Sequence, residues 1–211
     1  MKWQERCADF YVAEDYLPRE VAQSHLLDIL RLGEDKERGF HHPRLKPNRF
    51  HAAPRYPVDH YMGFGMYWDP LDYLYHAHMM HNGLAPWPLP EWLVKLCQEV
   101  LEQTFPHHTN WRAEAALVNY YTTGRKMGRH IDKEEKDHRA PVIGFNFGGT
   151  CRFYYNDESF LLPGNSVYVF GDSARLMSHG VGAAYKKSLS WESVGILKEG
   201  ERLNVTVRQV T

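Results

Sequence analysis

Three observations predict a mainly β protein with flanking helices (α+β), whose core is a jelly roll or a related double-sheet barrel. From residue 116 onward, short apolar runs alternate with turn residues such as Gly148-Gly149 and Asn156-Asp157. Upstream, two stretches have the apolar spacing of amphipathic helices. The last strand-like run, residues 202–208, alternates polar and apolar side chains at period two.

The first half of the chain predicts one short strand and two helices. Residues 8–14 form the strand. A helix over residues 18–32 begins at Pro18, a residue suited to the first turn, and carries a broad apolar stripe. The second helix, over residues 91–103, follows a proline-rich connector. We expect both helices to pack on the outside of a sheet.

Between the helices lies an irregular stretch, residues 33–60, followed by an aromatic segment, residues 61–75. The aromatic side chains are Tyr61, Phe64, Tyr67, Trp68, Tyr73 and Tyr75. The basic side chains just before them are Arg44, Lys46, Arg49 and Arg55. Basic residues next to rings can bind phosphates and bases, and the rings can equally well cap the barrel core. The sequence leaves both interpretations open.

The second half predicts successive strands joined by short turns. Their expected ranges are 116–121, 130–132, 142–147, 152–155, 159–162, 166–170, 179–181, 188–194 and 203–210.

Length and composition bound the class of protein. The 211 residues correspond to one domain, or one domain with an extension, and 43% hydrophobic with 24% charged residues is ordinary for a globular protein. No apolar run reaches the roughly 18 residues of a membrane span, and no signal peptide is evident. Three widely spaced cysteines indicate reduced thiols in a cytoplasm-like compartment, which would be nuclear or cytoplasmic in a eukaryote. We expect a monomer.

The net charge of −1 argues mildly against extensive binding of duplex nucleic acid, because proteins of that kind are usually basic. It is compatible with a short single-stranded footprint or a single flipped base.

His130 and Asp132 are separated by one residue, so on an extended strand their side chains would point to the same face. His179 is the best candidate for a third ligand. Two imidazoles and one carboxylate form the facial triad of non-haem Fe(II) oxygenases. Other histidines, His107, His108 and His138, lack such support and are predicted to lie on the surface.

The run 202–208 places Arg202, Asn204, Thr206 and Arg208 on one face and apolar residues on the other. The polar face could be solvated on an edge strand. If it points into a barrel, the two arginines need anionic partners, because unpaired buried charge is costly. A small dicarboxylate would satisfy both, since arginine binds carboxylates bidentately.

An ordered set of motifs resembles the AlkB-type Fe(II)/2-oxoglutarate-dependent dioxygenases. The motifs are Asn119-x-Tyr121, Gly124, His130-x-Asp132, Ala140-Pro141, Ser173-x-Arg175, His179-Gly180-Val181 and Arg202-x-Asn204-x-Thr206-x-Arg208. The resemblance covers about residues 113–210 and implies a double-stranded β-helix. We therefore expect a catalytic core over residues 113–211 and, packed on it as one compact domain, an extension over residues 1–112 that carries the helices and an aromatic and basic lid.

The resemblance implies that His130, Asp132 and His179 bind Fe2+ and that the co-substrates are 2-oxoglutarate and O2. It assigns 2-oxoglutarate to Asn119, Tyr121, Arg202, Asn204 and Arg208, with Arg202 at the carboxylate remote from iron and Arg208 at the nearer one. Alternatively, the arginines neutralise Glu134 or Asp137. The implied reaction yields succinate and CO2 and hydroxylates a substrate C–H bond; on an N-methyl group, the product then loses formaldehyde.

For the substrate, the resemblance implies an alkylated base in DNA or RNA, stacked on Trp68 and Tyr73 and read by Glu134. Glu134 is equally well interpreted as a solvated charge. The short turn at Asn156-Asp157, where several relatives carry a longer basic loop, and the unfamiliar stretch 33–60 weaken the nucleic-acid interpretation. The alternatives are a small metabolite, peptide or lipid substrate, or a binding module with a vestigial metal site, against which the complete triad and both arginines argue.

Overall fold

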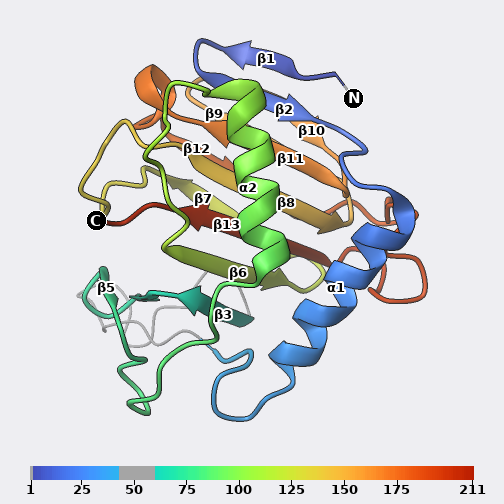
Figure 1. Ribbon diagram of the computed structural model, residues 1–211. Helices are drawn as coiled ribbons and strands as arrows, with labels where there is room; N and C mark the ends of the chain where they lie inside the picture. Colours follow the sequence, from blue (N-terminus) through green and yellow to red (C-terminus); the bar gives the residue numbers. More distant parts are fainter. Residues whose placement is uncertain (1, 43–59) are drawn as a thin grey trace, which may run out of the picture.

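A computed structural model describes residues 2–42 and 60–211, which form two facing antiparallel sheets with two helices on one outer face (Figure 1). Across the larger sheet the strand order is β1 (Gln4–Cys7), β2 (Phe10–Ala13), β11 (Ser166–Phe170), β8 (Val142–Gly148), β13 (Arg202–Arg208), β6 (Ala115–Tyr121) and β3 (His60–Gly65). The smaller sheet has the order β10 (Glu158–Leu162), β9 (Cys151–Tyr155), β12 (His179–Val181) and β7 (Met127–His130). A separate pair joins β4 (Tyr67–Asp69) and β5 (Leu74–His76). The predicted jelly-roll core with flanking helices is confirmed.

The two predicted helices are confirmed and cover the larger sheet (Figure 1). Helix α1 (Arg19–Gly33) begins directly after Pro18, and helix α2 (Glu91–Thr104) directly after Pro90. Their buried side chains, among them Leu26 and Val100, belong to the same apolar cluster as residues of β6, β8 and β13. Neither helix of the described chain is long and apolar enough to cross a membrane.

Strand β13 lies inside the larger sheet, hydrogen-bonded to β6 on one side and β8 on the other. Leu203, Val205 and Val207 are fully buried in the cluster beneath the helices. The alternate residues of the strand face the space between the sheets and line a cavity there. The strand is therefore not an edge strand, and its two arginines are buried.

Two of the predicted strands are wrong. Residues 188–194 form turns, with isolated bridges at Leu189 and Val194. The Ser193 N–H donates to the Ser190 carbonyl (2.9 Å) and the Ile196 N–H to the Ser193 carbonyl (3.0 Å), so these backbone groups form local turns and not a strand ladder.

The predicted strand 130–132 instead ends at His130, because its partner β12 begins its pairing at His179, opposite His130. Ile131 and Asp132 therefore lie outside the sheet. The sequence also missed β1, a polar edge strand that pairs with β2.

The N-terminal and C-terminal parts of the chain share one sheet. Strand β2 pairs with β11, and β3 pairs with β6. The predicted division between an extension and a core at residue 112 stays a prediction. The three cysteines of the described chain are free thiols, and Cys97 and Cys151 are buried.

Candidate active site

His130, Asp132 and His179 converge at one end of the smaller sheet. His130 closes β7, His179 opens β12 directly opposite it, and Asp132 follows in the loop after β7. Asp132 Oδ1 lies 3.5 Å from His130 Nε2, and Oδ2 lies 3.9 Å from His179 Nε2. One ligand atom from each residue falls within 4.8 Å of the other two. The three side chains can therefore hold one metal ion, although the loop, and not a common strand face, brings Asp132 to the histidines.

Hydrogen bonds orient both imidazoles towards this cluster. Nδ1 of His130 lies 2.9 Å from the Gly128 carbonyl oxygen, and Nδ1 of His179 lies 3.2 Å from the Met177 carbonyl oxygen. A carbonyl can only accept, so each Nδ1 donates, and each Nε2 keeps its lone pair for a metal.

Burial and neighbouring charges put the ligands in the states that a metal requires. Burial alone would raise the pKa of Asp132, but Arg208 and the two imidazoles outweigh it and hold that pKa well below its usual range. Burial lowers the pKa of His179 to about 4, despite the attraction of Asp132. At neutral pH the cluster therefore offers an ionised carboxylate and a neutral buried imidazole, the forms that coordinate metal ions.

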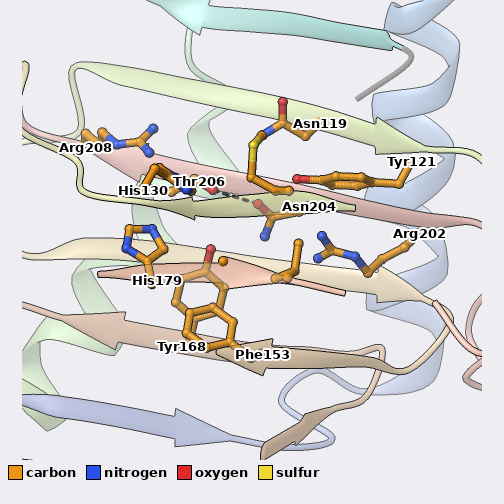
Figure 2. Close-up of a pocket in the computed structure, with 13 residues that line it drawn as sticks. Asn119, Tyr121, His130, Phe153, Tyr168, His179, Arg202, Asn204, Thr206 and Arg208 are labelled. Atoms are coloured by element: carbon orange, nitrogen blue, oxygen red, sulfur yellow. Dashed lines mark hydrogen bonds between the residues drawn. The ribbon is translucent and has the colours of Figure 1, made fainter. Parts of the chain in front are cut away.

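A cavity beside the cluster is lined by the polar face of β13 (Figure 2). Arg208, His130 and His179 stand at one end of it and Arg202 at the other. Arg202 is 2% exposed, donates from Nη1 to Asn146 Oδ1 (2.8 Å) and stacks on the Tyr121 ring at 4.2 Å. No acidic side chain of the described residues pairs with it. An anion bound beside this guanidinium would compensate its buried charge.

Arg208 connects this cavity to the cluster. Its Nη2 lies 2.6 Å from Asp132 Oδ2, and its Nε lies 3.2 Å from Glu135 Oε1. Its acidic partners are thus Asp132 and Glu135, not the Glu134 or Asp137 considered from sequence. Arg208 Nη1 and Asn119 Oδ1 are buried without a hydrogen-bond partner within the described chain. Both residues line the cavity, so polar ligand atoms could satisfy them.

A second cavity, of about 280 Å³, also borders the cluster, because His130 and Asp132 line it. Its lining includes the predicted substrate residues Trp68, Tyr73 and Glu134. The Trp68 and Tyr73 rings meet edge to face, with centroids 5.7 Å apart. His130, Arg208 and Asn119 line both cavities. The possible metal position therefore lies where an anion-binding cavity and an aromatic cavity meet. The basic residues Arg44, Lys46, Arg49 and Arg55 lie outside the described residues.

The sequence profile of the 2OG-Fe(II) oxygenase superfamily matches residues 9–208. The chain belongs to this superfamily. The name of this superfamily implies Fe2+ and 2-oxoglutarate, and His130, Asp132 and His179 form a candidate metal site.

Similar proteins confirm the AlkB-type resemblance. The AlkB dioxygenase of Escherichia coli K12 is 36% identical over 107 residues, covering 46% of this chain and 47% of AlkB. The Arabidopsis thaliana DNA N(6)-methyladenine demethylase ALKBH1A is 27% identical over 158 residues, covering 64% and 44% of the two chains. This chain thus spans about half the length of these relatives. The solved structure of OsALKBH1 has the same fold, with a TM-score of 0.85, 23% identity and coverage of 99% and 100%.

Three residues to which the sequence assigned no role at the site, Arg175, Glu135 and Tyr75, form a network around Asp132. Arg175 Nη1 donates to the Asp132 carbonyl oxygen (2.6 Å), and its Nη2 pairs with Glu135 Oε2 (2.7 Å). The Tyr75 hydroxyl donates to Glu135 Oε1 (2.5 Å). Arg175 was visible in the Ser173-x-Arg175 motif, but no local pattern distinguishes buried Glu135 from its half-buried neighbour Glu134.

Proposed function

We propose that this oxygenase binds Fe2+ through His130, Asp132 and His179 and uses 2-oxoglutarate and O2 to demethylate N-alkylated bases in DNA or RNA. The position of the triad between the anion-binding cavity and the aromatic cavity carries this proposal. A co-substrate can reach the metal from the first cavity and a planar substrate from the second. The names of the relatives, a dioxygenase and a DNA demethylase, support the same chemistry.

The residues fit Fe2+ because two imidazoles and one carboxylate on one side of an ion leave positions for the co-substrates. Arg208 keeps Asp132 ionised, and the carbonyls of Gly128 and Met177 hold both imidazoles in the coordinating tautomer. Arg175 holds the backbone of Asp132 in place.

The polar face of β13 fits 2-oxoglutarate. Arg202, stacked on Tyr121, binds the carboxylate remote from the metal, and Arg208 Nη1 binds the nearer one. Asn204 positions this site, because its Nδ2 lies 3.2 Å from Asn146 Oδ1, the atom that accepts from Arg202. Asn119 contributes its unpaired amide oxygen or, if the amide is flipped, a donor.

When bound together, Fe2+, 2-oxoglutarate and O2 supply the oxidising chemistry, which yields succinate, CO2 and a hydroxylated N-methyl group that leaves as formaldehyde. The chain's own residues orient the reactants. Trp68 and Tyr73 stack on the base, and Glu134 accepts a hydrogen bond from its exocyclic amine. The near-zero net charge favours a short, single-stranded substrate over a long duplex. We place the enzyme, as a monomer, in a reducing intracellular compartment.

The test is formaldehyde release from single-stranded DNA and RNA oligonucleotides that carry N1-methyladenine, N3-methylcytosine or N6-methyladenine. Unmethylated oligonucleotides and reactions without 2-oxoglutarate are the controls. We expect formaldehyde and succinate in equal amounts from at least one methylated oligonucleotide. Consumption of 2-oxoglutarate without formaldehyde from any of them would exclude the nucleic-acid substrate and leave a small metabolite, a peptide side chain or a lipid.

A further inference from the structure

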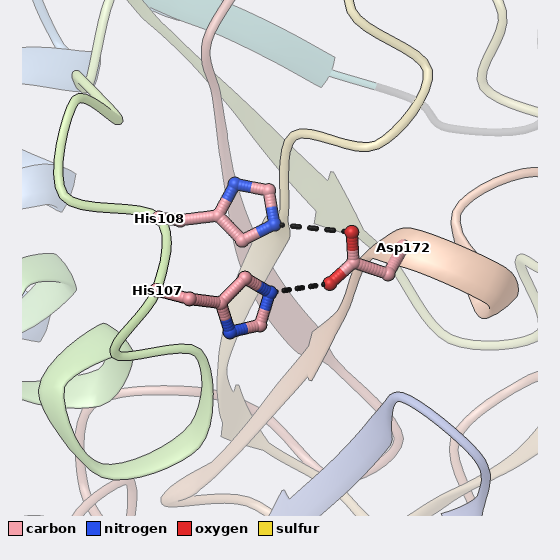
Figure 3. A group of neighbouring side chains, drawn as sticks. All are labelled: His107, His108 and Asp172. Atoms are coloured by element: carbon pink, nitrogen blue, oxygen red, sulfur yellow. Dashed lines mark hydrogen bonds and ion pairs between the residues drawn. The ribbon is translucent and has the colours of Figure 1, made fainter.

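We infer that this chain carries a second metal site, formed by His107, His108 and Asp172, which binds one divalent transition-metal ion of the Zn2+, Ni2+ or Cu2+ class (Figure 3). The two histidines lie in the loop after α2. Asp172 begins the short helix η1 (Asp172–Ala174) after β11. The site shares no residue with the triad.

The geometry suits one ion. His107 Nε2 lies 2.7 Å from Asp172 Oδ2, and His108 Nε2 lies 3.3 Å from Oδ1. One ligand atom from each residue lies within 4.8 Å of the other two. Figure 3 shows both imidazoles directed at the same carboxylate from one loop. Two imidazoles and a carboxylate, with positions left for water, are a common zinc ligand set, and imidazole also suits nickel and copper.

The contact of His108 is looser than that of His107. His108 Nε2 is buried, and its only contact with Asp172, at 3.3 Å from Oδ1, lacks the geometry of a good hydrogen bond. Buried polar atoms are rarely left without a partner. A metal ion coordinated by His107, His108 and Asp172 would satisfy this nitrogen through its lone pair.

Arg139 carries a positive charge beside Asp172 that opposes a bound cation, but it leaves one carboxylate oxygen of Asp172 accessible. Its Nε and Nη2 both lie 3.0 Å from Asp172 Oδ1, so Oδ2 remains for the ion and His107. The Arg139 side chain is 74% exposed, so solvent screens its charge. Arg139 therefore weakens metal binding without blocking it.

The bound ion would act structurally. It would tie the loop after α2 to η1, the turn that leads into Arg175, whose side chain holds the Asp132 backbone. An ion that binds only the folded protein stabilises it, by an amount that grows with the logarithm of the ion concentration above its dissociation constant. The site therefore stabilises the segment behind the triad and takes no part in the reaction.

The test counts metal ions by equilibrium dialysis of the full chain against Co2+, followed by elemental analysis. We expect H107A and D172N each to bind one ion fewer per chain than the wild type. H130A, which removes a triad ligand, should lose the other ion, so the two sites are counted separately. H76A is the matched control, because His76 pairs with Asp72 at 2.8 Å without belonging to a group of three metal ligands. It should bind as many ions as the wild type.

R139Q keeps the proposal testable if D172N does not fold. Removing the competing charge should lower the dissociation constant of the second ion by about 2- to 5-fold. H107A should fold normally, since the His107 side chain is 58% exposed; circular dichroism checks this. Wild-type stoichiometry in a folded H107A variant, or loss of an ion in H76A, would overturn the proposal.

Discussion

Arg175 and Glu135 form an ion pair of 2.7 Å in which both side chains are 1% exposed. Arg175 also donates to the Asp132 carbonyl oxygen, and Glu135 also accepts from Tyr75 and lies 3.2 Å from Arg208 Nε. The pair therefore supports the loop that carries Asp132 in two ways. Arg175 binds the backbone of Asp132, and Glu135 contacts Arg208, which pairs with the Asp132 carboxylate.

Removing one partner of this pair should destabilise the fold. Glu135→Ala leaves Arg175 buried without its acidic partner, which costs about 3–5 kcal/mol. Urea unfolding followed by circular dichroism measures the loss. Glu134→Ala, at the half-buried neighbouring position, is the control and should change the unfolding free energy by about 0.5 kcal/mol or less. Equal effects of the two substitutions would show that the buried pair has no special role.

His130→Ala, Asp132→Ala and His179→Ala should each abolish turnover because each removes a proposed iron ligand. His130→Ala is the cleanest of the three, since that side chain is 39% exposed and its loss should leave the fold intact. Iron content after anaerobic reconstitution and 2-oxoglutarate-dependent succinate release are measured, with His138→Ala as the control. A variant with wild-type turnover would remove its residue from the triad.

Arg202→Ala should weaken 2-oxoglutarate binding. A hydrogen bond to a charged group contributes about 1.5–3 kcal/mol, which corresponds to about a 10- to 150-fold rise in the Michaelis constant for 2-oxoglutarate. Arg152→Ala, at a partly exposed position on β9 where Nη1 donates to Ser159, is the matched control. An unchanged constant in Arg202→Ala would show that the co-substrate binds elsewhere.

Trp68→Ala should raise the Michaelis constant for an alkylated oligonucleotide about 5- to 150-fold, because stacking one base on one ring contributes about 1–3 kcal/mol. Uncoupled 2-oxoglutarate turnover should change little. Tyr185→Ala, which removes an aromatic ring that is 45% exposed and outside the cavity, is the control. A matching rise in Tyr185→Ala would contradict the stacking role.

Glu134→Ala should reduce discrimination between methylated adenine and methylated cytosine more than it reduces binding. The reason is that a lost acceptor removes the reading of the exocyclic amine and leaves the stacking intact. The ratio of kcat/KM for the two bases measures this. An unchanged ratio would mean that Glu134 is a solvated charge.

The sequence determined the parts of the fold that depend on local patterns. Period-two alternation in residues 202–208 was sufficient to separate a polar face from an apolar one, because adjacent side chains of any strand point to opposite sides. The apolar stripes of both helices identified them for a similar reason. The order of His130, Asp132 and His179 within the family motifs was enough to propose the triad.

Only the tertiary structure decided which charged residues are buried together. Glu134 and Glu135 are neighbours of the same type, and the contact of Glu135 with Arg175, 40 residues away, makes one of them structural. His107 and His108 were predicted to lie on the surface, and the His107 side chain is 58% exposed; only the fold shows that Asp172 lies beside both of them. Such pairings depend on strand register and loop packing over long distances in the chain, and no short window of sequence contains that information.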